Sequence, residues 1–365
     1  MFSLASGAAT RHSTTFQNPI APGADPWVVQ HGGWYYWCLS EKDLGVAVYR
    51  SHSLTQLGEK FIVWRAPERG PYSAQVWAPE LHWLNGRWYI YVAASDGNNE
   101  THRMIVLESN GSDPTRPFHF KSELYSGDDF VGRTHNRWAI DGTVLELNGS
   151  RYLLWSGWAD ERDEQWLYIA PMSNPWTLGA ARTRLCANDD FLWERVGESR
   201  HGRGLNEGPQ VLTRQGRVFV IYSCSGSWEA SYKLGMLELT VGTDPLDAAS
   251  WHKYSEPVFQ SKIPTACGVG HCSFTQSPDG REDWIVFHSK ISPTHGWQRV
   301  IRAQAFRWSA NGRPEFGAMV SSGFPAARPS GDRRADLTAR MPELIESIRI
   351  ERGAGEANGE AVTAP

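Results

Sequence analysis

The chain has 365 residues, 41% of them hydrophobic, and its 36 basic and 40 acidic side chains leave a net charge of −4. This hydrophobic content supports a substantial core, and the absence of a Lys/Arg block argues against nucleic acid or an anionic membrane as a partner. No apolar run approaches the roughly 18 residues that a membrane helix needs, so we expect no membrane span.

The first residues, MFSLASGAATRHSTTF, do not combine a basic start with a long apolar stretch, so they do not read as a signal peptide. By sequence alone the protein is expected to be cytoplasmic, or secreted if a signal has been removed. The five cysteines are odd in number and scattered, which favours buried free thiols over a disulfide scaffold. They are Cys38, Cys186, Cys224, Cys267 and Cys272.

Five segments along the chain share one pattern: a polar residue, a short apolar strand, a turn containing glycine, and a strongly aromatic strand. They begin at Ala24, Ala78, Ile140, Asn206 and Gly270. Asn85-Gly86 and Asp279-Gly280 are strong hairpin signals, because Asn, Asp and Gly tolerate a positive φ. A third strand follows each aromatic one, as in GVAVYRS and RMIVLES, and the first four units then continue into a Ser/Asp/Pro turn with room for a fourth strand.

Repeats of roughly 55–65 residues with four strands each are typical of propeller blades. We therefore predict an all-β, five-bladed β-propeller with four antiparallel strands per blade, and an all-β sandwich as the alternative. The predicted domain covers residues 16–325. Residues 1–15 form an N-terminal extension, and residues 326–365 form a C-terminal extension that is partly disordered.

The repeats open on polar residues that the fold would bring together. These are Asp25, Glu80, Asp141, Glu207 and His271. The innermost strands of a propeller line one axis, so residues at equivalent strand starts converge although they are far apart in sequence. Single acids at such places are commonly solvated turns, but here they recur within apolar and aromatic surroundings (DPWV, WAIDG, LNEGPQV). Glycoside hydrolysis needs one carboxylic acid and one carboxylate, and a third carboxylate can keep the acid protonated.

The motifs around these residues resemble, in order, the motif set of glycoside hydrolase family 43 over about residues 16–310. They are ADPWV at Asp25, WAPEL at residues 77–81, WAIDG at Asp141, NEGPQV at Glu207 and GHCSF at His271. Further segments, including HRMIVLESNGSDP and LYIAPMSNPWTL, are most similar to the exo-acting α-L-arabinofuranosidases of that family. One departure is Gly142, where many relatives carry proline.

The resemblance implies an inverting hydrolase that releases terminal arabinose from arabinan-type oligosaccharides and needs no cofactor for its chemistry. In that assignment Asp25 is the general base, Glu207 is the general acid, and Asp141 raises the pKa of Glu207 and orients it. Inversion requires room for a water molecule, so the carboxyls of Asp25 and Glu207 are expected to lie roughly 6.5–9.5 Å apart. The expected partner is an arabinose-containing oligo- or polysaccharide.

The resemblance also places His271 near the propeller axis, either beside a light cation such as Ca²⁺ or Na⁺ or as a structural hydrogen-bonding residue. Zinc is not expected, because His271 and Cys272 are strand neighbours that point to opposite faces. Trp77 and Trp158 are candidate sugar platforms, with core packing as the alternative for each. Arg302 is a candidate for binding a sugar hydroxyl, with a structural ion pair as the alternative, and Glu80 is expected to be structural.

Rival functions remain open at this point. Within the family they are β-xylosidase and endo-arabinanase, since pocket walls and loop lengths decide specificity. Outside it, a non-catalytic sugar-binding propeller would not need three carboxylates, and a fructan-cleaving propeller usually carries a Cys next to its acid, which NEGP lacks. A protein-interaction propeller would show more regular surface repeats. The sequence contains no GxSxG, P-loop or HExxH motif.

Overall fold

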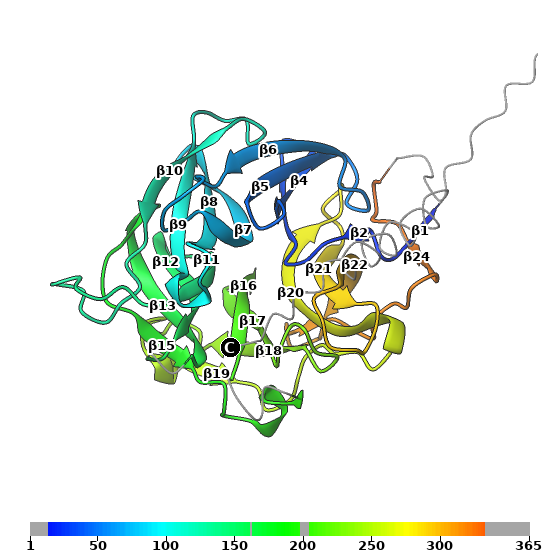
Figure 1. Cartoon of the computed structure of the whole chain (residues 1–365). Coiled ribbons are helices and arrows are strands. Elements are labelled where there is room, and N and C mark those ends of the chain that lie inside the picture. Colours follow the sequence, from blue (N-terminus) through cyan, green and yellow to red (C-terminus); the bar gives the residue numbers. More distant parts are fainter. Residues whose placement is uncertain (1–13, 161–162, 198–203, 333–365) are drawn as a thin grey trace, which may run out of the picture.

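The computed structural model describes residues 14–160, 163–197 and 204–332, and within them the fold is almost entirely β. Five small antiparallel sheets surround a common axis, like the blades of a propeller (Figure 1). This confirms the predicted five-bladed β-propeller and excludes the sandwich. Residues 1–13 and 333–365, which hold most of the two predicted extensions, lie outside the described residues.

Each blade runs outward from the axis through strands that follow one another in the chain. Blade 1 consists of β3 (Trp27–His31), β4 (Trp34–Ser40), β5 (Gly45–Ser51) and β6 (Glu59–Arg65). Blade 2 consists of β7 (Ala74–Leu84), β8 (Arg87–Ser95), β9 (Arg103–Ser109) and β10 (Phe118–Glu123). Blade 3 consists of β11 (Ala139–Leu147), β12 (Ser150–Trp158) and β13 (Gln165–Asn174), with β14 (Thr177–Leu178) and β15 (Thr183–Cys186) both paired to β13.

Blade 4 consists of β16 (Asn206–Arg214), β17 (Arg217–Cys224), β18 (Lys233–Leu239) and β19 (Trp251–Lys253). Blade 5 consists of β20 (Cys267–Gln276), β21 (Asp283–Lys290) and β22 (Arg299–Trp308), with β23 (Pro314–Glu315) paired to β22. Short 3₁₀ turns lie in the connections at Asn99–Thr101, Leu192–Glu194, Ala248–Ser250 and Pro264–Ala266. Among the described residues no helix is long and apolar enough to cross a membrane.

The first segment of the chain completes the last blade. Strand β2 (Ala21–Pro22) pairs with β22, so blade 5 takes its outer strand from the N-terminal end. Asn18 strengthens this closure, since its Nδ2 donates to the carbonyl of Ala303 at 2.8 Å and its Oδ1 accepts the Ala303 N–H at 3.1 Å. A small sheet of β1 (Thr15–Gln17) and β24 (Pro325–Ala327) then joins the two ends of the described chain.

The core is divided into five apolar clusters, each between two neighbouring blades. Trp88 packs between blades 1 and 2, Trp155 between blades 2 and 3, and Trp37 and Trp284 between blades 5 and 1. Many of the 18 tryptophans therefore fill the wedge-shaped gaps that adjacent twisted sheets leave. The five cysteines are free and buried, as expected from their spacing.

Candidate active site

A residue in a left-handed conformation recurs in the first part of each innermost strand or just before it. The φ angles are +48° at Asp25, +45° at Ala78, +58° at Asp141, +53° at Gly208 and +45° at His271. In β7, β11, β16 and β20 the strand register shifts at this point, which marks a β-bulge. A bulge re-aims the side chains beside it, and non-glycine residues with positive φ cluster at functional sites. The repeat therefore turns equivalent strand starts toward the axis.

His271 is the point at which the three predicted carboxylates meet. Its Nδ1 lies 3.3 Å from Oδ1 of Asp25, and a Cβ added to Gly208, the residue after Glu207, would stand 3.1 Å from the same nitrogen. The N–H of Gly208 donates to Oδ2 of Asp141 at 2.9 Å, which joins the strands of Asp141 and Glu207 directly. Burial lowers the pKa of His271, but Asp25, Asp141 and Glu207 together raise it above its ordinary value.

Asp25 is surrounded by nitrogen atoms from blade 5. Its Oδ1 lies 3.1 Å from Nη1 of Arg299 and 3.1 Å from Nδ1 of His288, in addition to the contact with His271. Burial alone would raise the pKa of Asp25. The Arg299 guanidinium and His271, together with a hydrogen-bond contribution from His288, outweigh burial and hold the pKa of Asp25 well below its usual range. Burial lowers the pKa of His288 to about 4, so this ring is neutral at neutral pH.

The pKa values of Asp141 and Glu207 are raised, whereas that of Asp25 is lowered. Both are buried, with 3% and 9% of their surfaces exposed. Burial raises the pKa of Asp141 to about 7; His271 opposes this rise, whereas repulsion from Glu207 adds to it. Burial also raises the pKa of Glu207, against a hydrogen bond from Tyr232. Burial and the repulsion between two close carboxyls thus favour the protonated forms of this pair, whereas the neighbouring cationic groups favour the ionised form of Asp25.

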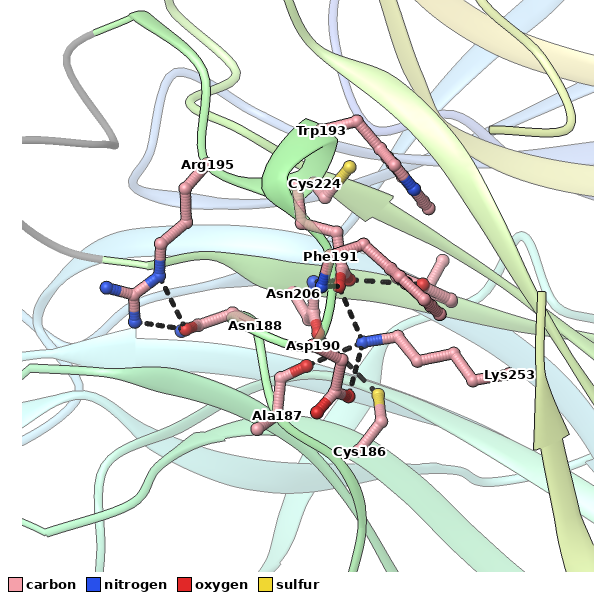
Figure 2. A network of polar contacts seen from close by, with 12 residues as sticks. Cys186, Ala187, Asn188, Asp190, Phe191, Trp193, Arg195, Asn206, Cys224 and Lys253 are labelled. Carbon is pink, nitrogen blue, oxygen red and sulfur yellow. Dashed lines mark hydrogen bonds and ion pairs between the residues drawn. The ribbon is translucent and has the colours of Figure 1, made fainter. Parts of the chain in front are cut away.

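The segment that leads into Glu207 is fixed by a buried polar network (Figure 2). The Nδ2 of Asn206 donates to Glu194 at 3.0 Å, and Nζ of Lys253 lies 2.8 Å from the other oxygen of Glu194. Lys253 also contacts Asp190 at 2.8 Å and donates to the carbonyl of Ala187. Glu194 and Asn206 are completely buried, so the backbone of the neighbouring Glu207 is held by an ion pair and not by solvent.

Comparisons with known proteins identify the family of the chain. Glycosyl hydrolases family 43 matches residues 16–314 of the chain. The chain belongs to this family.

Its relatives include an extracellular exo-α-(1→5)-L-arabinofuranosidase of Streptomyces avermitilis, which is 34% identical over 93% of this chain and 74% of the relative. The α-L-arabinofuranosidase 43 of Humicola insolens is 33% identical over 83% of this chain and 63% of its own length. The crystal structure of an α-L-arabinofuranosidase from Lactobacillus brevis superposes with a TM-score of 0.77 at 32% identity, covering 85% of this chain and 98% of that one.

The three residues predicted to bind the sugar in this family 43 hydrolase differ in how deeply they are buried. They are Trp77, Trp158 and Arg302. Trp77 is partly buried and stacks one ring face on His102, with ring centroids 3.9 Å apart. Trp158 is 8% exposed and stacks on Trp138 at 5.1 Å, within the core between blades 2 and 3. This packing favours the core role for Trp158, and its role as a sugar platform stays a prediction.

Arg302 also lies in the packed interior and is completely buried. Its guanidinium donates to Oγ of Ser289 and Oγ of Ser322, both at 2.6 Å, and to the carbonyl of Thr265 at 3.4 Å. The arginine that contacts Asp25 is Arg299, at the start of the same strand. Glu80 is 2% exposed and is hydrogen-bonded by His82 and Gln210, consistent with a structural role.

The light cation considered beside His271 stays unconfirmed. Within the described ranges, no group of three or more His, Cys, Asp or Glu side chains is arranged to hold a metal ion. The carboxylate that contacts the His271 ring belongs to Asp25, which the cationic Arg299 also contacts, and that is a poor arrangement for a further cation. The acid–base chemistry of the family needs no cofactor.

Sequence reasoning missed four residues that contact the carboxylates. They are Arg299, His288, Tyr232 and Gln165. One signal was available for the first of them. In an antiparallel blade the start of β20, the end of β21 and the start of β22 lie at one edge, as the pairs Cys267–Lys290 and Lys290–Arg299 confirm. This rule favours Arg299 over Arg302.

Proposed function

We propose that this family 43 hydrolase is an inverting, exo-acting α-L-arabinofuranosidase that releases terminal arabinose from arabinan-type oligosaccharides. The observation that carries the mechanism is the contrast between the surroundings of its carboxyls: Asp25 lies beside Arg299, whereas Asp141 and Glu207 are buried and repel each other. The substrate class is supported by the names of the relatives that are more than 30% identical.

In the proposed mechanism Asp25 takes a proton from a water molecule, which attacks the anomeric carbon on the face away from the leaving group. Asp25 can accept this proton because Arg299 and the neighbouring imidazoles keep it ionised. Glu207 carries the proton of the buried pair and donates it to the leaving oxygen. Asp141 keeps Glu207 protonated by repulsion, and its hydrogen bond from the Gly208 N–H fixes its position relative to the acid.

The position of His271 suggests a further electrostatic role. Asp25, Asp141 and Glu207 raise its pKa against the effect of burial, which favours the charged imidazolium among these carboxyls. This charge partly offsets the cost of burying several acids within one site. His271 is accordingly proposed as a structural and electrostatic centre.

Side-by-side hydrolysis of the nitrophenyl α-L-arabinofuranoside and β-D-xylopyranoside tests the proposal, with Asp25→Asn as the blank. We expect nitrophenol release from the arabinoside, at least about a thousand times less in the variant because the base is lost. A linear α-1,5-arabino-oligosaccharide should be shortened one unit at a time. Preference for the xyloside would show that the enzyme is a β-xylosidase. Release of internal fragments would show that it is an endo-arabinanase. No release from any of the three substrates would favour a non-catalytic sugar-binding propeller.

A further inference from the structure

Both oxygens of Glu207 are held by side-chain donors from different blades. The hydroxyl of Tyr232 donates to Oε1 at 2.8 Å, and Nε2 of Gln165 donates to Oε2 at 3.1 Å. We propose that Tyr232 and Gln165 are positioning residues that clamp the carboxyl of Glu207 in the orientation from which it protonates the leaving oxygen. The inference rests on the role proposed above for Glu207 and names the groups that control it.

Gln165 is fixed independently of Glu207. It is the first residue of β13, its N–H donates to the carbonyl of Gly204 at 3.0 Å, and it is 5% exposed. Its Nε2 also donates to Oγ of Ser156 at 3.1 Å, and that hydroxyl donates to the carbonyl of Asn206 at 2.8 Å. The amide has two N–H groups, and each has its own acceptor. The hydrogen bond to Ser156 therefore orients the amide without help from Glu207, and it leaves the second N–H for Oε2 of Glu207.

Tyr232 is fixed by the packing of its ring. The ring lies parallel to His288, with centroids 5.4 Å apart and planes 7° apart, and the residue is 1% exposed. The ring also packs closely against Gly270, where an added Cβ would overlap the ring edge of Tyr232. Burial raises the pKa of Tyr232 well above its usual value, so the phenol stays protonated and acts as a donor near neutral pH.

The clamp also affects the acidity of Glu207. Hydrogen bonds to a carboxylate favour its charged form, whereas burial disfavours it. The titratable groups that face Glu207 come from five places in the fold. They are Asp25 before β3, Asp141 on β11, Cys224 on β17, Tyr232 before β18 and His271 on β20. Burial raises the pKa of Glu207, and repulsion from Asp25 adds to this rise. The hydrogen bonds from Tyr232 and Gln165 and the nearby His271 oppose it. Losing one donor should therefore raise this pKa further.

The test compares Tyr232→Phe and Gln165→Met, which remove one donor each while keeping most of the side-chain volume. The control is Tyr91→Phe, which removes a buried hydroxyl bonded to the carbonyl of Pro175, away from Glu207. The basic limb of the pH profile, where kcat/KM falls as pH rises, reports the pKa of the general acid in the free enzyme. We expect it to move upward by roughly 1–2 pH units in both clamp variants, from the usual strength of a hydrogen bond to a charged group. The control should keep the wild-type limb.

A carbon-13 NMR titration of the Glu207 carboxyl, assigned by its loss in Glu207→Gln, gives the same pKa without turnover. Unchanged values in both folded clamp variants would overturn the clamp, and so would loss of folding in both, since the residues would then be structural. The two variants alter different blades, so if one fails to fold, the pKa of Glu207 in the other decides whether the clamp exists. The proposed function fails separately, if Glu207→Gln retains the basic limb on an unactivated oligosaccharide.

Discussion

Arg299 is expected to set the acidic limit of activity. It is the strongest cationic neighbour of Asp25, with Nη1 3.1 Å from Oδ1 and only 15% and 21% of the two side chains exposed. Replacing Arg299 by Met removes this charge, so the pKa of Asp25 should rise from its depressed value. Asp25 would then be protonated in mildly acidic solution and could no longer accept a proton from water.

The geometry gives the size of the effect. Two unit charges 3.1 Å apart attract by about 5 kcal/mol at an effective dielectric constant of about 20. At about 1.36 kcal/mol per pKa unit this is a ceiling of roughly 4 units. His271 and His288 still contact Asp25 in the variant, and partial exposure screens the pair. Carboxylates beside an arginine are commonly shifted by about 1–3 units, and we expect a rise in this range.

The assay is the pH dependence of kcat/KM on an activated aryl arabinofuranoside, with Arg299→Lys as the control that keeps the charge. In wild type Asp25 stays ionised as pH falls, so the rate should persist into acidic solution. In Arg299→Met the rate should fall at a pH higher by the predicted shift, and Arg299→Lys should lie between the two. If the acidic limb of Arg299→Met coincides with that of wild type, Arg299 does not control the base and the electrostatic reasoning is wrong.

Two further predictions concern the acid and its support. Glu207→Gln should lower kcat by about 10²–10⁴-fold on arabino-oligosaccharides but far less on a nitrophenyl arabinoside, whose leaving group needs little protonation; equal losses would show that Glu207 is not the acid. Lys253→Met should lower the free energy of unfolding by about 3–5 kcal/mol in denaturant titration, because Glu194 would keep a buried charge without its partner. Adding Glu194→Gln should recover part of this loss, and a double variant no more stable than the single one would contradict that cause.

The fold could be predicted because the repeat is regular. Turn glycines such as Gly86 and Gly149 have positive φ in the structure, as the hairpins require, and each aromatic strand lies where the pattern placed it. The convergence of Asp25, Asp141 and Glu207 followed from the same regularity, since equivalent strand starts face one axis. Their chemical roles remain predictions that the assays above decide.

Most of the residues that hold the carboxylates could not be found in this way, because their positions carry different side chains from blade to blade; Gln165 and Arg299, for example, each begin the third strand of a blade. Tyr232 lies in a connection between strands, and His288 lies near the end of β21. The tryptophans posed a different difficulty. Trp77 and Trp158 both occur in aromatic strands, and only the packing distinguishes a partly exposed ring from one buried against Trp138.

The closure of blade 5 by the N-terminal strand has a consequence for biosynthesis. Asp25 leaves the ribosome early, whereas Arg299 follows 274 residues later. His271 and His288 also belong to the last blade, so a nascent chain carries Asp25 long before any of the three groups that contact it. The surroundings of Asp25 are therefore complete only once blade 5 has joined the ring, and a chain that stops before blade 5 would have four blades and an Asp25 without these neighbours.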